Sequence, residues 1–250
     1  MKQCLITLFI SLLIVSNIYS QNNKNSKSVI HFNAEDGVKI TADLYLLPQP
    51  DAPIIILYHQ ARFSRGEYKE IAPKLNKLGF SCIAIDQRSG NEVNNVVNQT
   101  HLEAVKLKKA TEYIDAIPDV EAALRYVKKN FTPKKVIIWG SSYSSSLVLY
   151  MGGKYPDDVN GILAFSPGEY FKVDNKEIKI YASKIKSPVF ITSAKKEKEH
   201  WQDIYDSISS DKQYYLPETE GKHGSKALWV SNNGHQGYWD AVTSFLKKFK

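Results

Sequence analysis

Short apolar runs without internal alternation recur along the chain and predict the strands of a buried sheet. Strands that helices cover on both faces need apolar side chains at every position, whereas half-exposed strands alternate apolar and polar residues. Such runs occupy residues 54–58, 80–85, 136–139, 161–165 and 189–192, with a weaker run at 214–216. We therefore expect a mostly parallel sheet with helices on both faces.

Apolar residues at helical spacing separate these runs and predict the covering helices. The pattern places helices over residues 68–78, 107–114, 118–127, 143–150, a stretch that ends at 209, and 238–249. Residues 86–100 predict a long polar connection. Strands that alternate with helices in this way are typical of an α/β domain.

The sheet is expected to begin with an antiparallel hairpin. Residues 29–32 and 38–46 alternate apolar and polar side chains, and Asp36-Gly37 stands between them. An Asp-Gly pair tolerates the positive φ angles that tight hairpin turns require. These two runs are therefore predicted to pair with each other ahead of the parallel strands.

The N-terminus has the pattern of an export signal. Lys2 precedes an apolar core at residues 5–15, and Ser20 precedes a polar run. The apolar core has only about half of the roughly 20 residues that a membrane-spanning helix needs. We predict a signal peptide at residues 1–20, one folded domain at residues 27–250, no stable membrane insertion, and a periplasmic or extracellular location.

Composition narrows the chemistry. The 250 residues are 43% hydrophobic and 24% charged, as in ordinary globular chains, and the net charge of +7 comes from scattered lysines rather than a basic and aromatic cluster that would bind nucleic acid. No two histidines have a spacing typical of zinc ligands, and no phosphate-binding glycine loop is present. Cys4 lies in the predicted signal and Cys82 in an apolar run, which argues against a cysteine nucleophile. We expect no metal, cofactor or nucleic-acid partner.

A candidate nucleophile lies between the run at 136–139 and the helix that follows it. In a nucleophile elbow the serine sits on a strained strand-to-helix turn, so the residues two before and two after it must be small. Ser142 lies between Gly140 and Ser144, whereas Ser141 would place a bulky tryptophan in the crowded position. Ser144 is a weaker candidate because it lies further into the helix. A serine that merely caps the helix is the alternative to catalysis.

Three glutamates are candidates for an acid that orients a catalytic histidine. Parallel sheets gather functional groups at the carboxyl ends of their strands. Glu197 and Glu199 follow the run at 189–192, and Glu169 follows the run at 161–165. A stretch of alternating lysine and glutamate is also typical of a solvated helix start. Glu197 is favoured because of its distance from the strand at 189–192, and Glu199 and Glu169 are the alternatives.

The general base is expected after the last strand, because a serine on a nucleophile elbow is followed along the chain first by the acid and then by the histidine. His223 and His235 both satisfy that order. We favour His223, since it is nearer the strand and its neighbouring glycines suit a loop that crosses the sheet edge. His59 precedes the serine, and we expect it to be a packed, hydrogen-bonded residue.

The loop after the run at 54–58 is expected to contribute an oxyanion hole. Acyl transfer places negative charge on the carbonyl oxygen, and each fixed backbone N–H donor stabilises that charge by roughly 3 kcal/mol. We assign one donor to Gln60, with Ala61 as the alternative, and the other to Tyr143, which follows the candidate nucleophile.

In combination, these stretches resemble the α/β-hydrolase superfamily, and within it the dienelactone-hydrolase-like and serine-aminopeptidase-type enzymes. The resemblance is carried by residues 59–60, 65–68, 86–90, 139–144, 165–170 and 222–225. It implies an α/β-hydrolase fold over residues 27–250, with Ser142 as nucleophile, His223 as general base and then general acid, and Glu197 as the acid. Two departures are that dienelactone hydrolases use cysteine at the nucleophile position and that the usual His-Gly pair is His-Gln here.

The leading functional hypothesis is a secreted serine hydrolase that cleaves small carboxylic esters through an acyl-enzyme. A serine peptidase is the alternative enzyme, although the segment of about 20 residues between Phe165 and Pro188 is too short for a large cap domain that would hold a peptide. A non-catalytic binding protein is the third hypothesis, because Gln60 and Ser144 stand where glycine is usual.

Without a large cap, the strand-end loops must line the pocket. The predicted pocket residues are Arg62, Arg65, Arg88, Glu169 and Tyr170. Aromatic side chains suit a small acyl or aryl group, and an arginine would bind a substrate carboxylate through paired hydrogen bonds. The alternative is that the arginines form scaffold ion pairs, Arg88 with Asp86 and Arg65 with Glu67.

Overall fold

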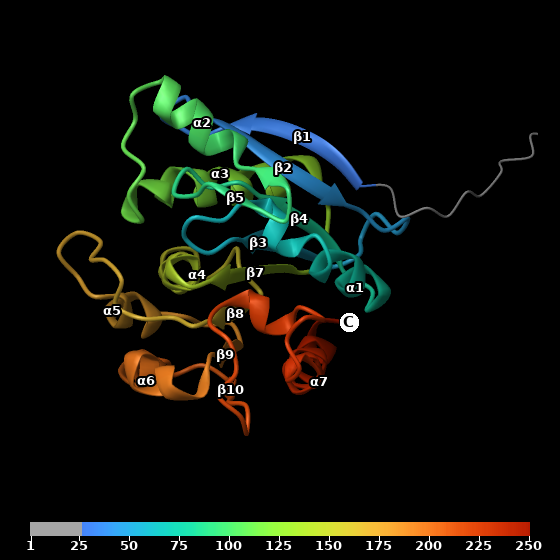
Figure 1. Cartoon of the computed structure of the whole chain (residues 1–250), viewed down its shortest axis with the longest axis vertical. Helices are drawn as coiled ribbons and strands as arrows, with labels where there is room; N and C mark the ends of the chain where they lie inside the picture. Colours follow the sequence, from blue (N-terminus) through green and yellow to red (C-terminus); the bar gives the residue numbers. More distant parts are fainter. Residues whose placement is uncertain (1–26) are drawn as a thin grey trace, which may run out of the picture.

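One sheet organises the chain. The computed structural model describes residues 27–250, so the predicted signal peptide at 1–20 lies outside the described residues. Within them, eight strands form a sheet in the order β1-β2-β4-β3-β7-β8-β9-β10 (Figure 1). These strands are β1 (Lys27–Asn33), β2 (Lys39–Tyr45), β3 (Ile54–Tyr58), β4 (Ser81–Ile85), β7 (Val136–Ser141), β8 (Gly161–Phe165), β9 (Val189–Thr192) and β10 (Lys212–Tyr215). The pairs β1–β2 and β2–β4 are antiparallel and the others parallel, which confirms the predicted mostly parallel sheet with an N-terminal hairpin.

Helices cover both faces of this sheet, as predicted. On one face pack α1 (Ile71–Lys77) and α7 (His235–Leu246); on the other pack α3 (Ile117–Asn130), α4 (Tyr143–Lys154), α5 (Ile178–Ala182) and α6 (Lys198–Ser207) (Figure 1). Short 3-10 turns are η1 (Arg65–Tyr68), η2 (Ile114–Ala116), η3 (Lys195–Glu197), η4 (Ser225–Leu228) and η5 (Lys247–Phe249). No helix within residues 27–250 is long and apolar enough to cross a membrane.

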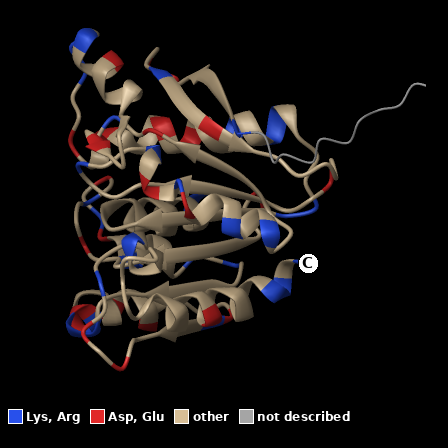
Figure 2. Cartoon of the chain, turned by 45° about the vertical axis from the view of Figure 1, so that its right-hand side comes forward, with Lys and Arg blue, Asp and Glu red and all other residues tan. Residues whose placement is uncertain are grey.

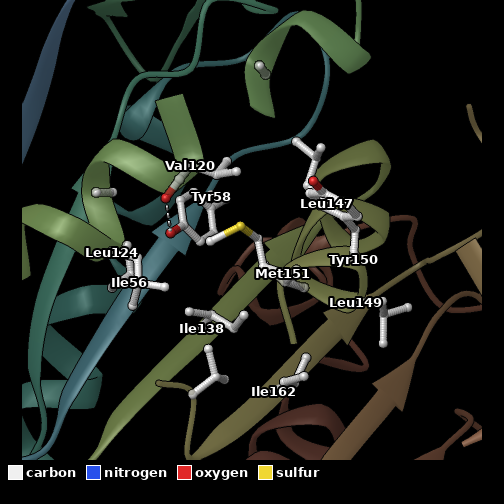
Figure 3. Packing of buried hydrophobic residues seen from close by; sticks show 14 of the residues in the cluster. Ile56, Tyr58, Val120, Leu124, Ile138, Leu147, Leu149, Tyr150, Met151 and Ile162 are labelled. Carbon is white, nitrogen blue, oxygen red and sulfur yellow. Dashed lines mark hydrogen bonds between the residues drawn. The ribbon is translucent and has the colours of Figure 1, made fainter. Parts of the chain in front are cut away.

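Successive residues of the central strands enter two different cores, which explains why their sequences do not alternate. Ile55 and Leu57 of β3 pack in the cluster with α1 and α7, whereas Ile56 and Tyr58 pack in the cluster with α3 and α4 (Figure 3). The Tyr58 hydroxyl donates to the carbonyl of Val120 at 3.1 Å, so the polar tip of this buried ring is also satisfied. Fully burying one aliphatic side chain contributes roughly 1.5–3 kcal/mol, so two apolar faces hold the sheet in place.

The connection between β4 and α3 differs from the prediction. The polar stretch at 86–100 contains a small hairpin, β5 (Glu92–Val93) and β6 (Val96–Val97). Its turn residues Asn94 and Asn95 both have positive φ angles, of 54° and 60°. Asparagine tolerates this conformation better than most residues, so the Asn-Asn pair was an unused hairpin signal.

The predicted helix at 107–114 is wrong, because the helix in this region, α2 (Gln99–Lys106), ends before that stretch. The Asn98 side chain caps its start by accepting a hydrogen bond from the His101 N–H at 2.8 Å. Lys108 has a left-handed φ of 55°, which stops the helix. Apolar spacing after residue 106 therefore belongs to a loop.

The parallel strands end level with one another, which brings their following loops to one edge. The register pairs Tyr58 with Gly140, Ser141 with Phe165, and Phe165 with Thr192. Charged residues lie mainly on the helices and loops around a largely uncharged sheet (Figure 2). The loops after β3, β7, β8 and β9 thus gather the candidate site residues at a single edge.

Candidate active site

Ser142 occupies a strained turn between β7 and α4. Its φ of 60° and ψ of −126° lie outside the conformations that a non-glycine residue readily adopts. Its N–H donates to the carbonyl of Phe165 at 2.7 Å, which holds the turn against β8. A Cβ at Gly140 would overlap the backbone of Ser144 and Ser145, so glycine is required two residues before the serine. This is the geometry that the elbow pattern predicted.

Three candidate residues lie in one hydrogen-bonded line. His223 Nε2 is 2.8 Å from Ser142 Oγ, and His223 Nδ1 is 2.8 Å from Glu197 Oε1. The carboxylate accepts a hydrogen bond from the Nδ1–H, which keeps the ring proton on Nδ1 and leaves the Nε2 lone pair facing the serine hydroxyl. The chain therefore brings together a serine, a base and an acid in the geometry that nucleophilic catalysis requires.

The Glu197 carboxylate is held in its ionised state. Burial raises its pKa, but hydrogen bonds from His223 and Ser166 outweigh that effect, and the net pKa is below the usual value. The Ser166 hydroxyl donates to Glu197 Oε2 at 2.7 Å and accepts from the Gly224 N–H at 2.9 Å. Ser166 thus fixes both the acid and the loop that carries the histidine. The sequence reasoning assigned it no role, although it directly follows β8.

The alternative nucleophile and the alternative base have other partners. Ser144 Oγ accepts from the Ser141 N–H at 2.9 Å and lies 2.7 Å from the Tyr58 carbonyl, so it clamps the elbow to β3. His235 Nδ1 contacts the Asn232 carbonyl at 2.7 Å, at the start of α7. Neither residue is joined to the line of three hydrogen-bonded residues.

The two alternative acids also lie elsewhere. Glu169, a predicted pocket residue, is exposed and accepts hydrogen bonds from the backbone N–H groups of Ile178 and Lys179, at the start of α5. Glu199 is exposed in the first turn of α6. Among the three glutamates, only Glu197 contacts a histidine.

The assignment of an oxyanion donor to Gln60 is wrong. Its N–H donates to the buried carboxylate of Glu67 at 2.7 Å and is therefore not free to bind a substrate oxygen. The Ala61 N–H, the alternative donor, has no hydrogen-bond partner in residues 27–250. The Tyr143 N–H is the first of α4, one of the groups that a helix leaves without an intrahelical partner.

His59 fixes the direction of the Ala61 N–H. The Gln87 N–H donates to His59 Nε2 at 2.9 Å, so the ring proton is on Nδ1, which donates to the Gln60 carbonyl at 2.8 Å. The peptide between Gln60 and Ala61 is planar, so holding its oxygen on one side points its N–H to the other. Burial lowers the pKa of His59 to about 4, which keeps the ring neutral in this role.

A cavity of about 270 Å³ opens beside the Ala61 backbone. Its lining consists of Ala61, Arg62, Ser89, Gly90, His101, Thr111, Glu112 and Tyr113. The Tyr113 ring stacks on Tyr143 at 4.7 Å and meets Tyr170 edge-on at 6.4 Å. The Tyr170 hydroxyl donates to the Ser166 carbonyl at 3.0 Å, and burial, opposed by the nearby Ser142 side chain, raises its pKa. The predicted pocket residue Tyr170 therefore lies next to the candidate nucleophile.

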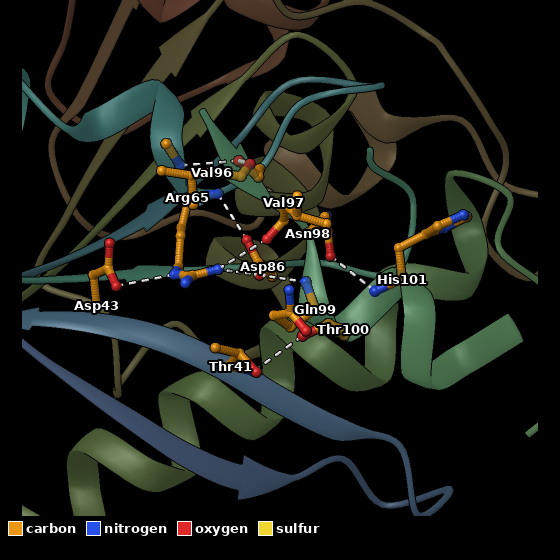
Figure 4. A network of polar contacts seen from close by, with 12 residues as sticks. Thr41, Asp43, Arg65, Asp86, Val96, Val97, Asn98, Gln99, Thr100 and His101 are labelled. Atoms are coloured by element: carbon orange, nitrogen blue, oxygen red, sulfur yellow. Dashed lines mark hydrogen bonds and ion pairs between the residues drawn. The ribbon is translucent and has the colours of Figure 1, made fainter. Parts of the chain in front are cut away.

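Two of the three predicted pocket arginines are instead buried scaffold residues. Arg65 Nε contacts Asp43 at 2.9 Å, and its Nη1 contacts Asp86 at 2.6 Å (Figure 4). Both of its partners lie on or directly after a strand, so Arg65 joins β2 and β4 to η1. The proposed pairing of Arg65 with Glu67 is wrong.

Arg88 has the same kind of environment with other partners. Its guanidinium contacts Asp119 and Asp36, each at 2.7 Å. The Arg88 side chain is 3% exposed, which leaves no donor for a substrate. Its predicted pairing with Asp86 is also wrong. Arg62 is different, because no ion pair or hydrogen bond of its side chain occurs within the described part of the chain.

A metal centre and a cysteine nucleophile are the other reactive centres to consider in a hydrolase. Within residues 27–250, no group of three histidine, cysteine, aspartate or glutamate side chains is placed to hold a metal ion. Cys82 is fully buried, as predicted, and burial raises the pKa of its thiol far above the usual range. A buried, protonated thiol is a poor nucleophile.

Comparisons with known proteins identify the family and the fold of this chain. A model of the family described as serine aminopeptidase, S33, matches residues 49–219. A putative carboxymethylenebutenolidase of Aquifex aeolicus is 27% identical over 168 residues, which cover 65% of this chain and 69% of that protein.

Solved structures share the fold at low sequence identity. An esterase of Pyrococcus furiosus superposes with a TM-score of 0.69 at 17% identity, over 90% of this chain and 93% of that one. A dienelactone hydrolase of Anabaena variabilis superposes with a TM-score of 0.68 at 13% identity, over 90% and 98% of the two chains. The predicted α/β-hydrolase fold is thereby confirmed.

Proposed function

The chain belongs to the serine aminopeptidase S33 family of hydrolases, and on that premise we propose that it cleaves small carboxylic esters through an acyl-enzyme on Ser142. The observation that carries the proposal is the line of hydrogen bonds from Ser142 through His223 to Glu197. A serine hydroxyl becomes a nucleophile when a positioned base accepts its proton as it attacks.

The reaction proceeds in two halves. Ser142 Oγ attacks the ester carbonyl carbon while His223 Nε2 takes the hydroxyl proton, and the Ala61 and Tyr143 N–H groups stabilise the oxyanion. Collapse of the tetrahedral intermediate breaks the bond to the alcohol oxygen, which receives the proton from His223. Water then attacks the acyl-enzyme with the same base, releasing the carboxylic acid and restoring the serine. Glu197 keeps the Nδ1 proton in place and stabilises the imidazolium that forms in each half.

The cavity beside Ala61 favours a small substrate. Its volume of about 270 Å³ is at the low end for ligand sites, and Tyr113, which meets Tyr170 edge-on, supplies an aromatic wall for a short acyl or aryl group. Arg62 lines the cavity and is the one predicted pocket arginine without a scaffold ion pair in the described residues. We therefore assign to Arg62 the carboxylate-binding role that the sequence offered to three arginines.

A peptidase is the second candidate, because the family is described as serine aminopeptidase. Within the described residues, the segment between β8 and β9 contains only the short helix α5, so no cap domain is present there to hold a peptide. Turnover of aryl acetates should exceed turnover of aminoacyl anilides. The reverse order would replace the esterase proposal with the peptidase.

Paired serine variants test the assignment. Ser142→Ala should lower kcat for an aryl ester by about 10⁴-fold or more, whereas Ser145→Ala, whose hydroxyl only contacts the Ser142 carbonyl, should stay within about 10-fold of the unmodified protein. Absence of turnover in the folded, unmodified protein, with any range of activated esters, would favour a binding protein on a hydrolase scaffold.

We also propose that the protein is exported after removal of residues 1–20. The supporting pattern is the charged start, short apolar core and small residue of the N-terminal sequence. Sequencing the N-terminus of protein recovered from outside the cytoplasm should give a start at or near Gln21. A mature chain that starts at Met1 would contradict the proposal.

A further inference from the structure

Glu67 is a fully buried carboxylate beneath the candidate oxyanion loop. It lies in η1 with no exposed surface. Its two oxygens accept hydrogen bonds from two neutral donors, Oε2 from the Gln60 N–H and Oε1 from the Ser141 hydroxyl, both at 2.7 Å. These donors stand one residue before Ala61 and one residue before Ser142. A charge without a cationic contact partner is costly to bury, so its placement here needs a reason.

The contacts of this carboxylate continue into the loop that carries His223. Ser141 Oγ accepts from the Ser225 N–H at 2.8 Å, and Ser225 Oγ accepts from the Trp139 ring N–H at 2.9 Å. Ser225 lies two residues after His223. One carboxylate therefore connects the loop after β3, the end of β7 and the loop after β10, which together supply the oxyanion donor, the nucleophile and the base.

We propose that Glu67 is a positioning residue of this site, which keeps the Ala61 N–H and the Ser142 turn in register by holding the Gln60 N–H and the Ser141 hydroxyl. The proposal rests on the function proposed above. Glu67 holds the nitrogen side of Gln60, and His59 holds its carbonyl side at 2.8 Å. With both ends of this residue fixed, the next N–H has one direction.

The charge state of Glu67 is poised near neutral pH. Burial raises its pKa to about 7, opposed by the hydrogen bonds from Gln60 and Ser141 and by the electrostatic influence of Lys226 and the His223 ring. The phenols of Tyr68 and Tyr143 are also close, and burial raises the pKa of each. Protonation would leave Glu67 with one acceptor oxygen and one O–H donor, so the Ser141 hydroxyl would have to change from donor to acceptor, and the contacts as they stand belong to the ionised form.

Two substitutions separate positioning from a merely structural role. In Glu67→Gln, the side-chain oxygen can accept from Gln60 and the amide can donate to Ser141 Oγ, so volume and contacts are kept while the charge is removed. Glu67→Ala removes both contacts. Glu70→Gln is the matched control, because Glu70 is exposed in the same region and makes no side-chain cap at α1.

The kinetic experiment measures kcat and KM for an aryl ester between pH 5 and pH 9. Glu67→Ala should lower kcat about 100-fold with KM changed less than about threefold, as for loss of an oxyanion donor. Glu67→Gln should retain kcat within about 10-fold. The acidic limb of its plot of kcat against pH should lose one of the two ionisations that the unmodified protein shows, namely that of Glu67. Superimposable pH profiles for the Gln variant and the unmodified protein would overturn the proposal, and Glu70→Gln should change neither quantity.

A second readout keeps the test independent of turnover. Amide hydrogen exchange at Gln60, whose N–H is bonded to Glu67, should accelerate at least about 10-fold in Glu67→Ala, and also in Glu67→Gln to a smaller extent, relative to Glu70→Gln. Unchanged exchange in folded Glu67→Gln and Glu67→Ala would overturn the positioning role even if the protein proves to be an esterase. Accelerated exchange together with no esterase activity in the unmodified protein would instead refute the proposed function alone. Should Glu67→Ala fail to fold, the Gln variant decides by its pH profile and its exchange rates.

Discussion

The line Ser142–His223–Glu197 and the arginine cluster around Arg88 lie at the same edge of the sheet but have different chemical capacity. Arg88 is 3% exposed and its guanidinium is divided between two carboxylates, Asp36 and Asp119. His223 has a side chain 35% exposed, and its Nε2 faces a single hydroxyl. In the arginine cluster every guanidinium nitrogen is paired with a carboxylate of the protein, whereas the catalytic line ends in the Ser142 hydroxyl.

Charge and position in the sequence do not distinguish these two clusters. Arg65 and Arg88 follow strands and lie in polar segments, as the catalytic candidates do. The guanidinium groups of both nevertheless form ion pairs within the protein and are not available to a substrate. Buried pairs of this kind mostly specify how segments dock, since removal of one partner leaves an uncompensated charge. A functional residue is recognised by a donor or acceptor that the protein leaves unused.

The largest expected effect separates two histidines that both follow the last strand. His223→Ala should lower kcat for an aryl ester by about 10⁴-fold or more, because the serine would lose its base. His235→Ala should change kcat less than about threefold, since His235 contacts only the Asn232 carbonyl. Equal losses in the two variants would remove the distinction between the site and its surroundings.

Breaking the arginine cluster should affect stability instead of chemistry. Arg88→Met leaves Asp119, which has no exposed side-chain surface, without its cation, so the free energy of unfolding should fall by about 3–5 kcal/mol. Urea unfolding measures that loss, and kcat per folded molecule should stay within about threefold. A stable Arg88→Met protein with a large increase in KM would contradict the scaffold role and support the predicted role of Arg88 in substrate binding.

Glu67 belongs to the catalytic edge but is buried like the arginines, so its charge should affect stability as a function of pH. Its pKa is raised from 4.5 to about 7 in the folded protein, so its stabilising contribution is complete below pH 4.5 and is lost as pH rises through 7. A shift of this size corresponds to about 3 kcal/mol.

Urea unfolding from pH 4.5 to pH 8 measures this term in the protein and in Glu67→Gln. The unmodified protein should lose about 3 kcal/mol more than the variant over that range, because glutamine does not titrate. Parallel stability curves would show that the carboxyl titrates at its ordinary pKa, and the charge-state argument for its role would fail.

The smallest predicted effect concerns Arg62, the predicted pocket arginine that forms no ion pair within the described residues. Arg62→Ala should raise KM about 10-fold for an ester with a terminal carboxylate and leave a matched neutral ester unchanged, as expected for a charged hydrogen bond of about 1.5 kcal/mol. Stability should change by less than about 0.5 kcal/mol because Arg62 is exposed. Equal changes in KM for both esters would remove its role in carboxylate binding.

Local patterns were enough to predict the sheet and the elbow. The strained turn at Ser142 requires a small residue at position 140, and strands buried on both faces require unbroken apolar runs. Both features therefore depend on residues that are neighbours in the sequence. The preference for His223 relied on chain order and nearby glycines. The structure places that residue 2.8 Å from Ser142 Oγ.

Long-range partners could not be predicted in the same way. Arg88 pairs with residues 52 and 31 positions away, whereas the sequence offered only the nearby Asp86. The buried contact of Glu67 with the Gln60 N–H depends on how η1 folds back under its own loop. α2 was misplaced because the Asn98 cap was not weighed against apolar spacing.

Labelling with a serine-directed aryl phosphonate, followed by mass spectrometry of the peptides, tests the central claim most directly. The account predicts a single adduct on Ser142 in the folded protein, formed in proportion to the loss of esterase activity and absent from Ser142→Ala and from unfolded protein. An adduct on another residue, or no adduct on folded protein, would contradict the assignment of Ser142 as the nucleophile.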